Sequence, residues 1–543
     1  MRGTLRKEPQ GEAEPSGPDE LHRGPQDDSI LWGGGKRRAG RNARATRCGA
    51  RRATGRRARW GAISRAVGLG LLLLAVPVWP QAVTPKPVLI RDATVIDGTG
   101  GKVQPGVSIL IERDVIQAIG KDVKAPPDAT TIDAKGKYVI PGLIDARVKL
   151  GPSPANRLSR EEVNVEQQVR NLRALLQAGV TTARLIQGNI ADQQFYERAW
   201  NENILTSPRL VVSGPIFTVA HGHPWEEYSP IAPQARAEQL RQVSSAAEAK
   251  TMTNAAIQAG VEVVEAVYDA GMKPHPFPRL SPGELAAIVT AAHAQKRKVF
   301  CAVSTNAEAQ AAVRAGCDAI EGVWQEAMSG QTAALMAEKK VFYMPVLTNQ
   351  GDLINLISPD DLASYLKDPI VAKTVSKLYR DSVESPGGIL GYLRKALGAD
   401  PAARQGMSEQ EKRAQDSVRV AQVAGVRVIV GTEAGDTLIF PGASLDRELQ
   451  LLVEAGLTPG QAIIAATKNT AAALGLGATT GTIAVGKQGD LVILSADPLA
   501  NIRNVEDVDT VICSGRVLGS EQLPAPAPKA APKPAPKATG KGP

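Results

Sequence analysis

Two histidines and one pair of basic residues are the side chains whose spacing points most directly to chemistry. His221 and His223 are the only two of the five histidines that lie close together in the sequence. Two imidazoles can bind a transition metal when carboxylates complete the ligand set. They can also make polar contacts to a substrate, or belong to a solvated turn without a chemical role. All three interpretations stay open at this point.

Arg147 and Lys149 follow an apolar, strand-like run and are separated by one residue. Residues two apart on a strand point to the same side, so both cations are predicted to point into one interior. Neither side chain offers a lone pair to a metal at neutral pH. A buried lysine beside an arginine can acquire a lowered pKa and act as a nucleophile, whereas neighbouring carboxylates keep it protonated.

Other catalytic constellations and charged partners are disfavoured by the composition. The sequence contains no serine nucleophile elbow and no paired-cysteine motif, and its four cysteines include one, Cys48, in the leader. The remaining three cannot form a complete disulfide framework. The net charge of +9 resides in residues 1–66, which hold 16 Lys/Arg and 7 Asp/Glu. The rest of the chain is neutral, so nucleic acid is not a predicted partner.

The two ends of the chain are predicted to lie outside the fold. Residues 1–66 form a disordered basic leader, and 521–543 form a disordered tail rich in Pro, Ala and Lys. Residues 67–82 contain a short apolar run behind two arginines, which predicts a signal peptide or a retained N-terminal membrane anchor. The protein is therefore expected to be exported, either periplasmic or secreted, or anchored to the inner membrane.

Between these ends, the hydrophobic periodicity predicts an α/β protein. Short strands with a period of two occur at 88–97, 107–111 and 115–119, and strand-like runs return near 490–494 and 508–513. The middle of the chain alternates helices with eight candidate strands, at 138–150, 180–187, 209–218, 261–268, 298–304, 318–323, 341–347 and 426–432. This pattern predicts a (β/α)₈ barrel over 141–477. A small β-sandwich domain would form from 86–140 and 478–520, and the polar insertion 350–420 is expected to be a lid.

Several segments resemble the amidohydrolase superfamily, in particular its imidazolonepropionase- and prolidase-like branch. They occur in the family's order from about 86 to 520, and they are 88–98, 138–145, 179–182, 455–459, 465–469, 481–487 and 490–494. The resemblance implies the same fold and a hydrolase that acts on carbon–nitrogen bonds with zinc or another divalent metal. It also implies a peptide-like ligand at the barrel mouth and leaves room for a homo-oligomer.

The positions that match the family's metal ligands hold different residue types here. Family histidines correspond to Arg147, Lys149, Ala302 and Gly322, the carboxylated lysine corresponds to Glu265, and the aspartate corresponds to Glu433. We therefore predict that no metal cofactor is bound. An ion-pair cluster of Arg147 and Lys149 with Glu265 and Glu433 would replace it, or these side chains would turn outward into solvent.

Three functions follow from this substitution. The first is an exported protein of the family that is non-catalytic or strongly impaired, with His223 and His221 as ligand contacts. The second is a divergent hydrolase, which uses a displaced metal at His221, His223, Glu265 and Glu433, or acid–base chemistry by Glu265 and Glu433 alone. The third is an envelope scaffold whose leader and tail make the contacts.

Overall fold

The computed structural model describes residues 86–150, 165–225, 233–271, 276–322, 325–348, 401–436 and 438–518, with a few positions between 366 and 381. The predicted leader, the apolar run 67–82, the tail 521–543 and His275 lie outside the described residues. Of the predicted lid, 350–420, the described part is mainly the beginning of one long helix, α14 (Pro401–Val423).

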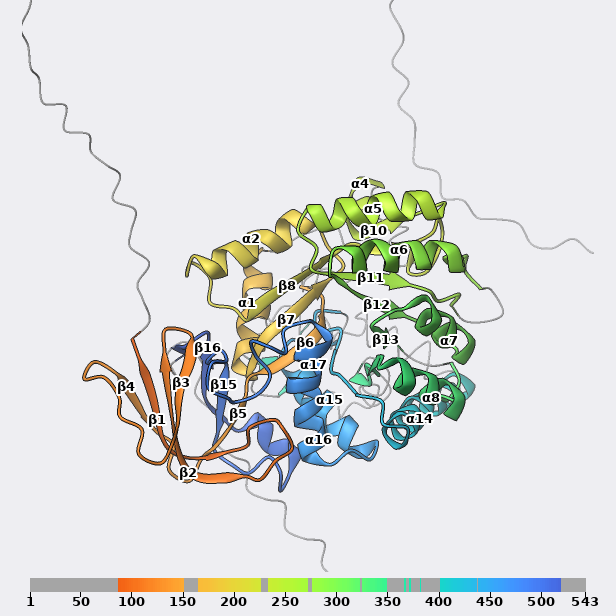
Figure 1. The fold of residues 1–543 in the computed structure, drawn as a ribbon. Helices are drawn as coiled ribbons and strands as arrows, with labels where there is room; N and C mark the ends of the chain where they lie inside the picture. The colour runs from red at the N-terminus through yellow and green to blue at the C-terminus, as the bar shows by residue number, and fades with distance from the viewer. Residues whose placement is uncertain are drawn as a thin grey trace, which may run out of the picture. The chain divides into compact units, whose positions relative to one another are not determined.

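One sheet is built from both ends of the described chain (Figure 1). Its early strands are β1 (Val88–Val95), β2 (Gln104–Glu112), β3 (Val115–Gly120), β4 (Thr130–Asp133) and β5 (Tyr138–Pro141). Its late strands are β15 (Leu491–Leu494), β16 (Val508–Cys513) and β17 (Arg516–Leu518). The two groups meet where β15 pairs antiparallel with β5. Apolar side chains such as Ile90, Ile109 and Ile493 form a core of their own here, as the predicted small β domain requires.

Eight parallel segments form a closed barrel beside this sheet. In order they are β6 (Leu143–Val148), β7 (Val180–Ile186), β8 (Arg209–Gly214) with β9 (Ile216–Thr218), β11 (Val263–Val267), β12 (Lys298–Ala302), β13 (Ala319–Glu321), β14 (Phe342–Met344) and residues 428–434. The last segment forms no continuous ladder. It closes the ring through the bridges Tyr343–Val428 and Val148–Ala434. The predicted eightfold barrel is thereby confirmed.

Helices cover the outside of the barrel and connect its strands (Figure 1). Most carry a side-chain cap; for example, Ser281 and Glu284 form a reciprocal capping box at the start of α6. The helices are α1 (Val165–Gln177), α2 (Ile190–Asn201), α4 (Pro233–Gln239), α5 (Ala246–Gln258), α6 (Pro282–Ala294), α7 (Asn306–Ala315), α8 (Gly330–Lys339), α14, α15 (Ala443–Glu454), α16 (Pro459–Ile464) and α17 (Thr470–Ala473). A π-helical turn at Ala465–Asn469 joins α16 to α17, a 3₁₀ turn spans Ile502–Glu506, and a short strand, β10 (Leu240–Gln242), pairs with β9.

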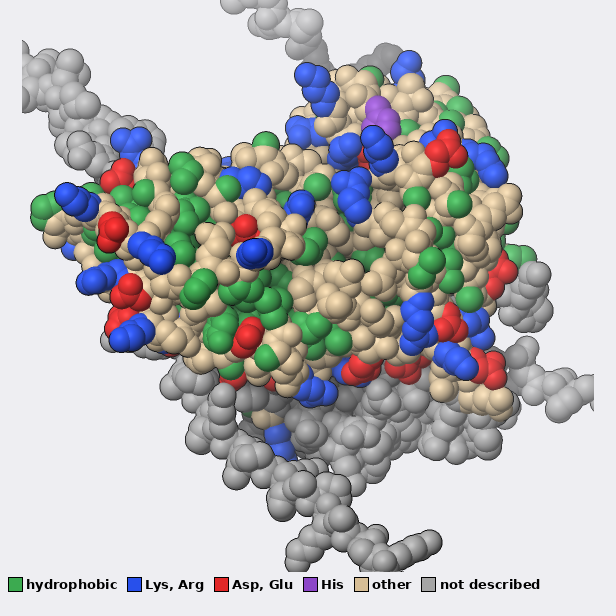
Figure 2. Space-filling model, turned by 60° about the horizontal axis from the view of Figure 1, so that its bottom comes forward, with side chains coloured by type: hydrophobic (Ala, Val, Ile, Leu, Met, Phe, Trp, Pro, Cys, Tyr) green, Lys and Arg blue, Asp and Glu red, His purple; other side chains and the backbone are tan. Residues whose placement is uncertain are grey.

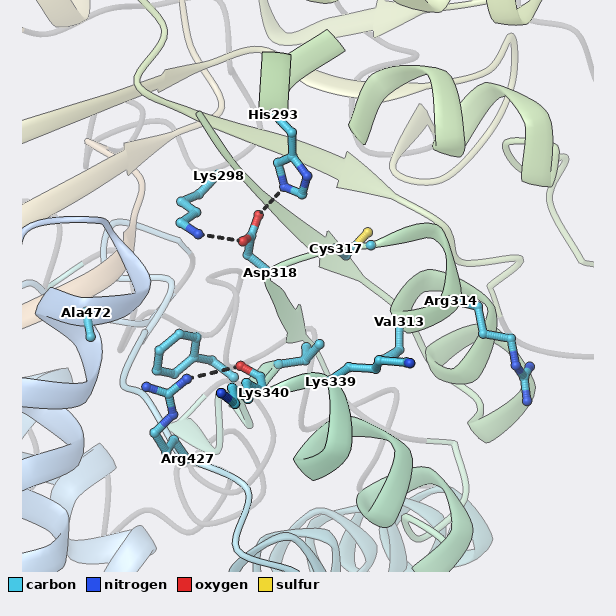
Figure 3. Close-up of a pocket in the computed structure, with 13 residues that line it drawn as sticks. His293, Lys298, Val313, Arg314, Cys317, Asp318, Lys339, Lys340, Arg427 and Ala472 are labelled. Atoms are coloured by element: carbon cyan, nitrogen blue, oxygen red, sulfur yellow. Dashed lines mark hydrogen bonds and ion pairs between the residues drawn. The ribbon is translucent and has the colours of Figure 1, made fainter. Parts of the chain in front are cut away.

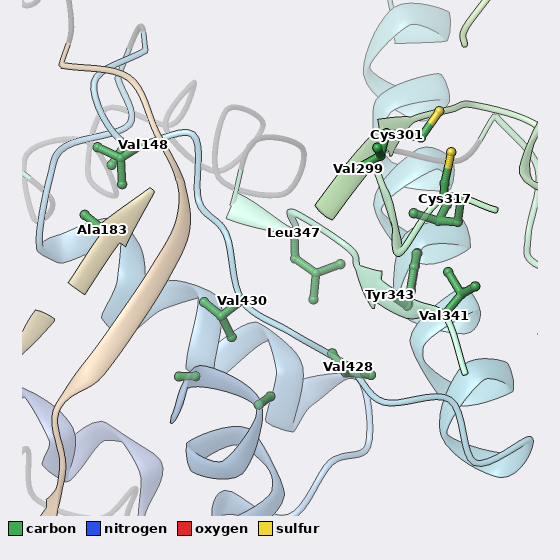
Figure 4. Close-up of a cluster of buried hydrophobic side chains, with 14 of the residues drawn as sticks. Val148, Ala183, Val299, Cys301, Cys317, Val341, Tyr343, Leu347, Val428 and Val430 are labelled. Atoms are coloured by element: carbon green, nitrogen blue, oxygen red, sulfur yellow. The ribbon is translucent and has the colours of Figure 1, made fainter. Parts of the chain in front are cut away.

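Outward-facing side chains of the strands make the main hydrophobic core under the helices. Val299 and Cys301 of β12, Tyr343 of β14, and Val428 and Val430 belong to this cluster (Figure 4). Because side chains alternate along a strand, the residues between them point into the barrel. The barrel interior therefore contains Phe342 and Ile429 near the beginnings of their segments and Phe300 in the middle of β12. Toward the ends of the strands the interior is charged.

The predicted strand 138–150 is two strands in the structure. β5 joins the sheet, β6 joins the barrel, and Gly142 lies between them. A Cβ atom at Gly142 would lie 2.0 Å from Thr181 Oγ1, so glycine is needed for this close approach of the backbone to the Thr181 side chain. The chain changes sheets here without a loop, which the continuous apolar pattern concealed.

The described surface carries both signs of charge. Figure 2 shows basic and acidic side chains intermixed over one face, with a group of basic side chains near a histidine. Within the described residues, no helix combines the length and the apolar character needed to span a bilayer.

Candidate functional site at the carboxyl ends of the barrel strands

A buried arginine lies at the centre of the charged layer inside the barrel. Arg147 is near the end of β6, is 7% exposed, and donates from Nε to Glu433 Oε1 at 2.8 Å. Its Nη1 atom forms further ion pairs with Glu265 of β11 and Glu321 of β13. One guanidinium thus joins carboxylates from three different strand ends. Arg147 is suited to this because its planar head carries five donors and stays charged.

A second buried arginine binds two of the same carboxylates. Arg184 of β7 is fully buried and donates from Nη1 to Glu265 Oε2 at 2.7 Å. Its Nη2 atom lies 3.2 Å from Glu321 Oε1, and its guanidinium lies 4.4 Å from the centroid of the Phe300 ring. Glu265 and Glu321 therefore each pair with both arginines, so neither buried carboxylate lacks a counter-charge.

Lys149 lies beside this arrangement and has its own carboxylate. Its Nζ atom is 2.6 Å from Asp436 Oδ2 and 4.0 Å from Glu433 Oε1. The predicted cluster of Arg147 and Lys149 with Glu265 and Glu433 is thus confirmed in its main contacts. The predicted list of members was incomplete, because Arg184, Glu321 and Asp436 also belong to the observed cluster. We call these seven residues the ion-pair network.

The protonation of the network follows from its burial and charges. Burial raises the pKa of Glu265, but Arg147 and Arg184 together pull it below its ordinary value. Burial raises the pKa of Glu321 to about 7, and neighbouring Glu265 adds to the shift, while the arginines oppose it. Of the two carboxyls that both arginines share, Glu321 therefore carries a proton more readily than Glu265.

Hydrogen bonds of the Asp145 carboxylate and of the backbone hold β6 and the last barrel segment together around the network. Asp145 accepts hydrogen bonds from the Thr432 hydroxyl at 2.6 Å and from the backbone N–H groups of Thr432 and Arg147 at 3.1 Å each. Burial nevertheless raises the pKa of Asp145 to about 6. Glu433 donates its backbone N–H to the Arg147 carbonyl at 2.7 Å and has a φ of +61°. This left-handed backbone is unfavourable for glutamate, and the contacts of Asp145 and Arg147 hold it in place.

The two remaining ligand positions of the resemblance offer no donor. Ala302 is in register with Glu321 across the β12–β13 ladder. Gly322 has a φ of +119°, and a Cβ atom there would lie 2.9 Å from the Val303 carbonyl oxygen. The backbone at Gly322 therefore has no room for a side chain of any kind.

The histidine loop forms a separate group of contacts. His221 is exposed and makes an edge contact to Trp225, with 4.7 Å between ring centroids. His223 is half-buried, its ring lies 6.0 Å from that of Phe277, and its carbonyl accepts from Thr218 Oγ1 at 2.9 Å. In the part of the chain that is described, no three His, Cys, Asp or Glu side chains are placed to hold one metal ion. The structure therefore does not assemble the alternative site of both histidines with Glu265 and Glu433.

Comparison with known proteins places this chain in a family. A model of the amidohydrolase family matches residues 138–518. The chain belongs to the amidohydrolase family. It is 24% identical to an ochratoxinase of Aspergillus niger over 455 residues, which cover 78% of this chain and 85% of that protein.

Solved structures of the family share the fold. The crystal structure of the A. niger ochratoxinase has a TM-score of 0.63 and 22% identity, and covers 80% of this chain and 96% of that one. A putative prolidase from Bifidobacterium longum has a TM-score of 0.62 and 23% identity, and covers 82% and 97%. The small β domain and the barrel are therefore the architecture of this family. The charged residues described above lie at the carboxyl ends of the strands, where barrel enzymes have their active sites.

The network predicts that Arg147 is essential for stability. We expect Arg147→Met to lower the free energy of unfolding by about 3–5 kcal/mol, because three buried carboxylates lose a shared partner. The loss should be smaller at pH 5 than at pH 8, because protonation of the orphaned carboxyls removes their charge. Urea denaturation of the full chain measures both effects. Arg170→Met is the matched control, since the Arg170–Glu166 pair is solvent-exposed and should contribute less than about 1 kcal/mol. Equal effects of the two variants would contradict the network.

A buried glutamate outside the network predicts a pH dependence. Glu448 of α15 accepts from the N–H groups of Leu347 at 3.0 Å and Thr348 at 2.8 Å, and burial raises its pKa to about 7. Its ordinary value is 4.5, so the folded protein binds this proton more tightly than the unfolded chain. The resulting stability is complete below the unfolded pKa and is lost as the pH rises to about 7.

We therefore expect Glu448→Gln to remove a slope of about 1.4 kcal/mol per pH unit in that interval. Leu347 and Thr348 donate to different oxygens of Glu448, so glutamine keeps only one of the two acceptors. This loss should lower the stability by about 1 kcal/mol at every pH, and the change of slope remains the readout. Urea denaturation of both proteins at several pH values between 4.5 and 7 is the test. Identical slopes in the two proteins would show that Glu448 does not titrate as described.

Proposed function

We propose that this protein has exchanged the metal centre of its family for the ion-pair network and does not act as a metal-dependent hydrolase. It functions instead as a binding or structural member of the family. The observation that carries the proposal is the place of Arg147, whose guanidinium pairs with carboxylates from three strands. In a metal-dependent relative, a dication would serve as the shared positive charge.

The residues present do not fit a divalent metal. Arg147 and Lys149 offer no lone pair and would repel a dication. The carboxylates that could attract one, Glu265 and Glu433, already bind Arg147. The backbone at Gly322 leaves no space for a ligand side chain. A bound metal normally supplies a hydroxide near neutral pH and polarises the scissile carbonyl, so we derive no hydrolytic step that depends on one.

A second candidate function rests on the unequal protonation of two neighbouring carboxyls. Glu265 has a lowered pKa and Glu321 a raised pKa of about 7. Such a pair can divide acid and base roles between two carboxyl groups, and thereby support hydrolysis without a metal. Both side chains are fully buried and held by arginines, which favours the non-catalytic function.

Metal analysis with an activity assay tests the proposal. We expect protein purified without a histidine tag to contain far less than one transition-metal ion per chain. Added zinc or EDTA should leave the thermal midpoint unchanged, because a metal stabilises only a folded state that binds it. N-acyl amino acids and Xaa-Pro dipeptides should not be hydrolysed with added zinc.

Three outcomes separate the alternatives. One tightly held metal ion per chain, whose removal lowers the thermal midpoint, would overturn the proposal. Hydrolysis that persists in EDTA and disappears in Glu321→Gln would establish the metal-free alternative. Neither a metal nor hydrolysis, in a protein that unfolds cooperatively, is the result that we expect.

We also propose that the protein is exported through residues 67–82. The support is the short apolar run behind Arg59 and Arg65, which is too short for an ordinary bilayer-spanning helix of about 20 residues. Expression of the full chain, cell fractionation and N-terminal sequencing form the test. A new N-terminus near Ala82 in the exported fraction indicates cleavage, and an intact chain in the membrane fraction indicates an anchor. An intact cytoplasmic chain would contradict export.

A further inference from the structure

Figure 3 shows a basic cavity, whose volume is about 570 Å³. Several of its lining residues lie at the beginnings of barrel strands, at the end opposite the ion-pair network. Its lining includes Lys298, the first residue of β12, and Phe342, the first residue of β14. Lys340 at the end of α8 and Arg427 just before the last barrel segment complete this side. The ion-pair network occupies the carboxyl ends of the same strands. The cavity is therefore a second location, separated from the network by the apolar layer of the barrel interior.

The lining has a strong excess of positive charge. Five Lys and Arg side chains line the cavity, and Asp318 is its single acidic side chain. Asp318 is already shared, because it lies 2.8 Å from Lys298 Nζ and 2.8 Å from His293 Nε2. Arg314 extends away from the group (Figure 3). Residues 67–520 have a net charge of −3. The cavity is therefore a local group of positive charges in a part of the chain that is slightly acidic as a whole.

Arg427 is held with its guanidinium at this cavity. The group lies 3.9 Å from the centroid of the Phe342 ring, and Nη2 donates to the Lys340 carbonyl at 3.1 Å. Partial burial lowers the pKa of Arg427, and no neighbouring carboxylate offsets the shift. Among the described residues, neither Arg427 nor Lys340 has a carboxylate partner within ion-pair distance. The two residues are in contact through the Lys340 backbone carbonyl and line the same cavity, so two cations without a carboxylate partner among the described residues occur there.

We propose that this cavity binds a small polyanion that carries phosphate or carboxylate groups, with Arg427 and Lys340 as its contact residues. A planar guanidinium held by a ring and a carbonyl can present two parallel donors to either anion. The volume lies within the range of about 300–1,000 Å³ that is usual for small-molecule sites. Apolar side chains such as Val313 and Phe342 in the lining suit an anion with an organic part. The proposal does not depend on whether the protein is a hydrolase.

Titration calorimetry of the full chain at low ionic strength tests the site, with inorganic pyrophosphate and citrate as probes. We expect saturable binding of at least one probe with one molecule per chain, and weaker binding in added salt. Tighter binding of pyrophosphate would assign the site to phosphates, and tighter binding of citrate would assign it to polycarboxylates. No saturable binding of either probe at millimolar concentration would overturn the proposal.

Two variants and one control locate the binding. Arg427→Gln and Lys340→Gln should each weaken the better probe about tenfold, as expected for loss of a charged hydrogen bond. Lys250→Gln removes an equal charge from an exposed position on α5 and should leave the affinity unchanged. If all three variants weaken binding equally, the probe responds only to overall charge and the site is disproved. Lys340→Gln decides the matter if Arg427→Gln unfolds, because the Lys340 backbone carbonyl remains available to Arg427.

Discussion

An arginine that cannot lose its proton lies inside a closed barrel, and the surrounding structure compensates its charge. Arg147 retains its positive charge under all physiological conditions, so burial is tolerable only with carboxylates in direct contact. Two strands and the last barrel segment supply these carboxylates, through Glu265, Glu321 and Glu433. The last barrel segment departs from a regular ladder at this point, and Glu433 adopts a left-handed backbone that brings its carboxylate to the guanidinium.

Under the proposed function, the same constraint would explain how the family's scaffold can do without a metal. Negative groups that would surround a dication need another positive partner, and here the chain supplies Arg147 and Arg184. Such a network rigidifies a core when every member is satisfied, and it is costly when one member is lost. The raised pKa of Glu321, to about 7, allows the network to take up a proton in place of one negative charge.

The sequence predicted the fold more completely than the site. Periodicity identified the eight barrel segments and most strands of the sheet built from both ends of the described chain, because apolar alternation reports directly which face of a strand is buried. It missed the short strands β4 and β17. It also missed the change from one sheet to the other at Gly142, because the apolar residues continue without interruption from β5 into β6. Arg147 with Glu265 and Glu433 was predicted from family positions and strand direction. The sequence analysis missed Arg184, although a charged residue within the apolar strand 180–187 could have indicated a buried ion pair. Glu321 was noted only as the neighbour of Gly322. Which carboxylate meets which cation depends on the barrel's closure and on side-chain rotamers, and sequence spacing reports neither.

Anomalous diffraction from crystals grown with excess zinc tests the central claim most directly. Data collected on either side of the zinc absorption edge would locate any ion inside the barrel without reliance on activity. The account predicts continuous density for the Arg147 guanidinium against Glu265, Glu321 and Glu433, with no anomalous peak among them. A zinc peak bound by these carboxylates, with Arg147 turned toward solvent, would contradict it.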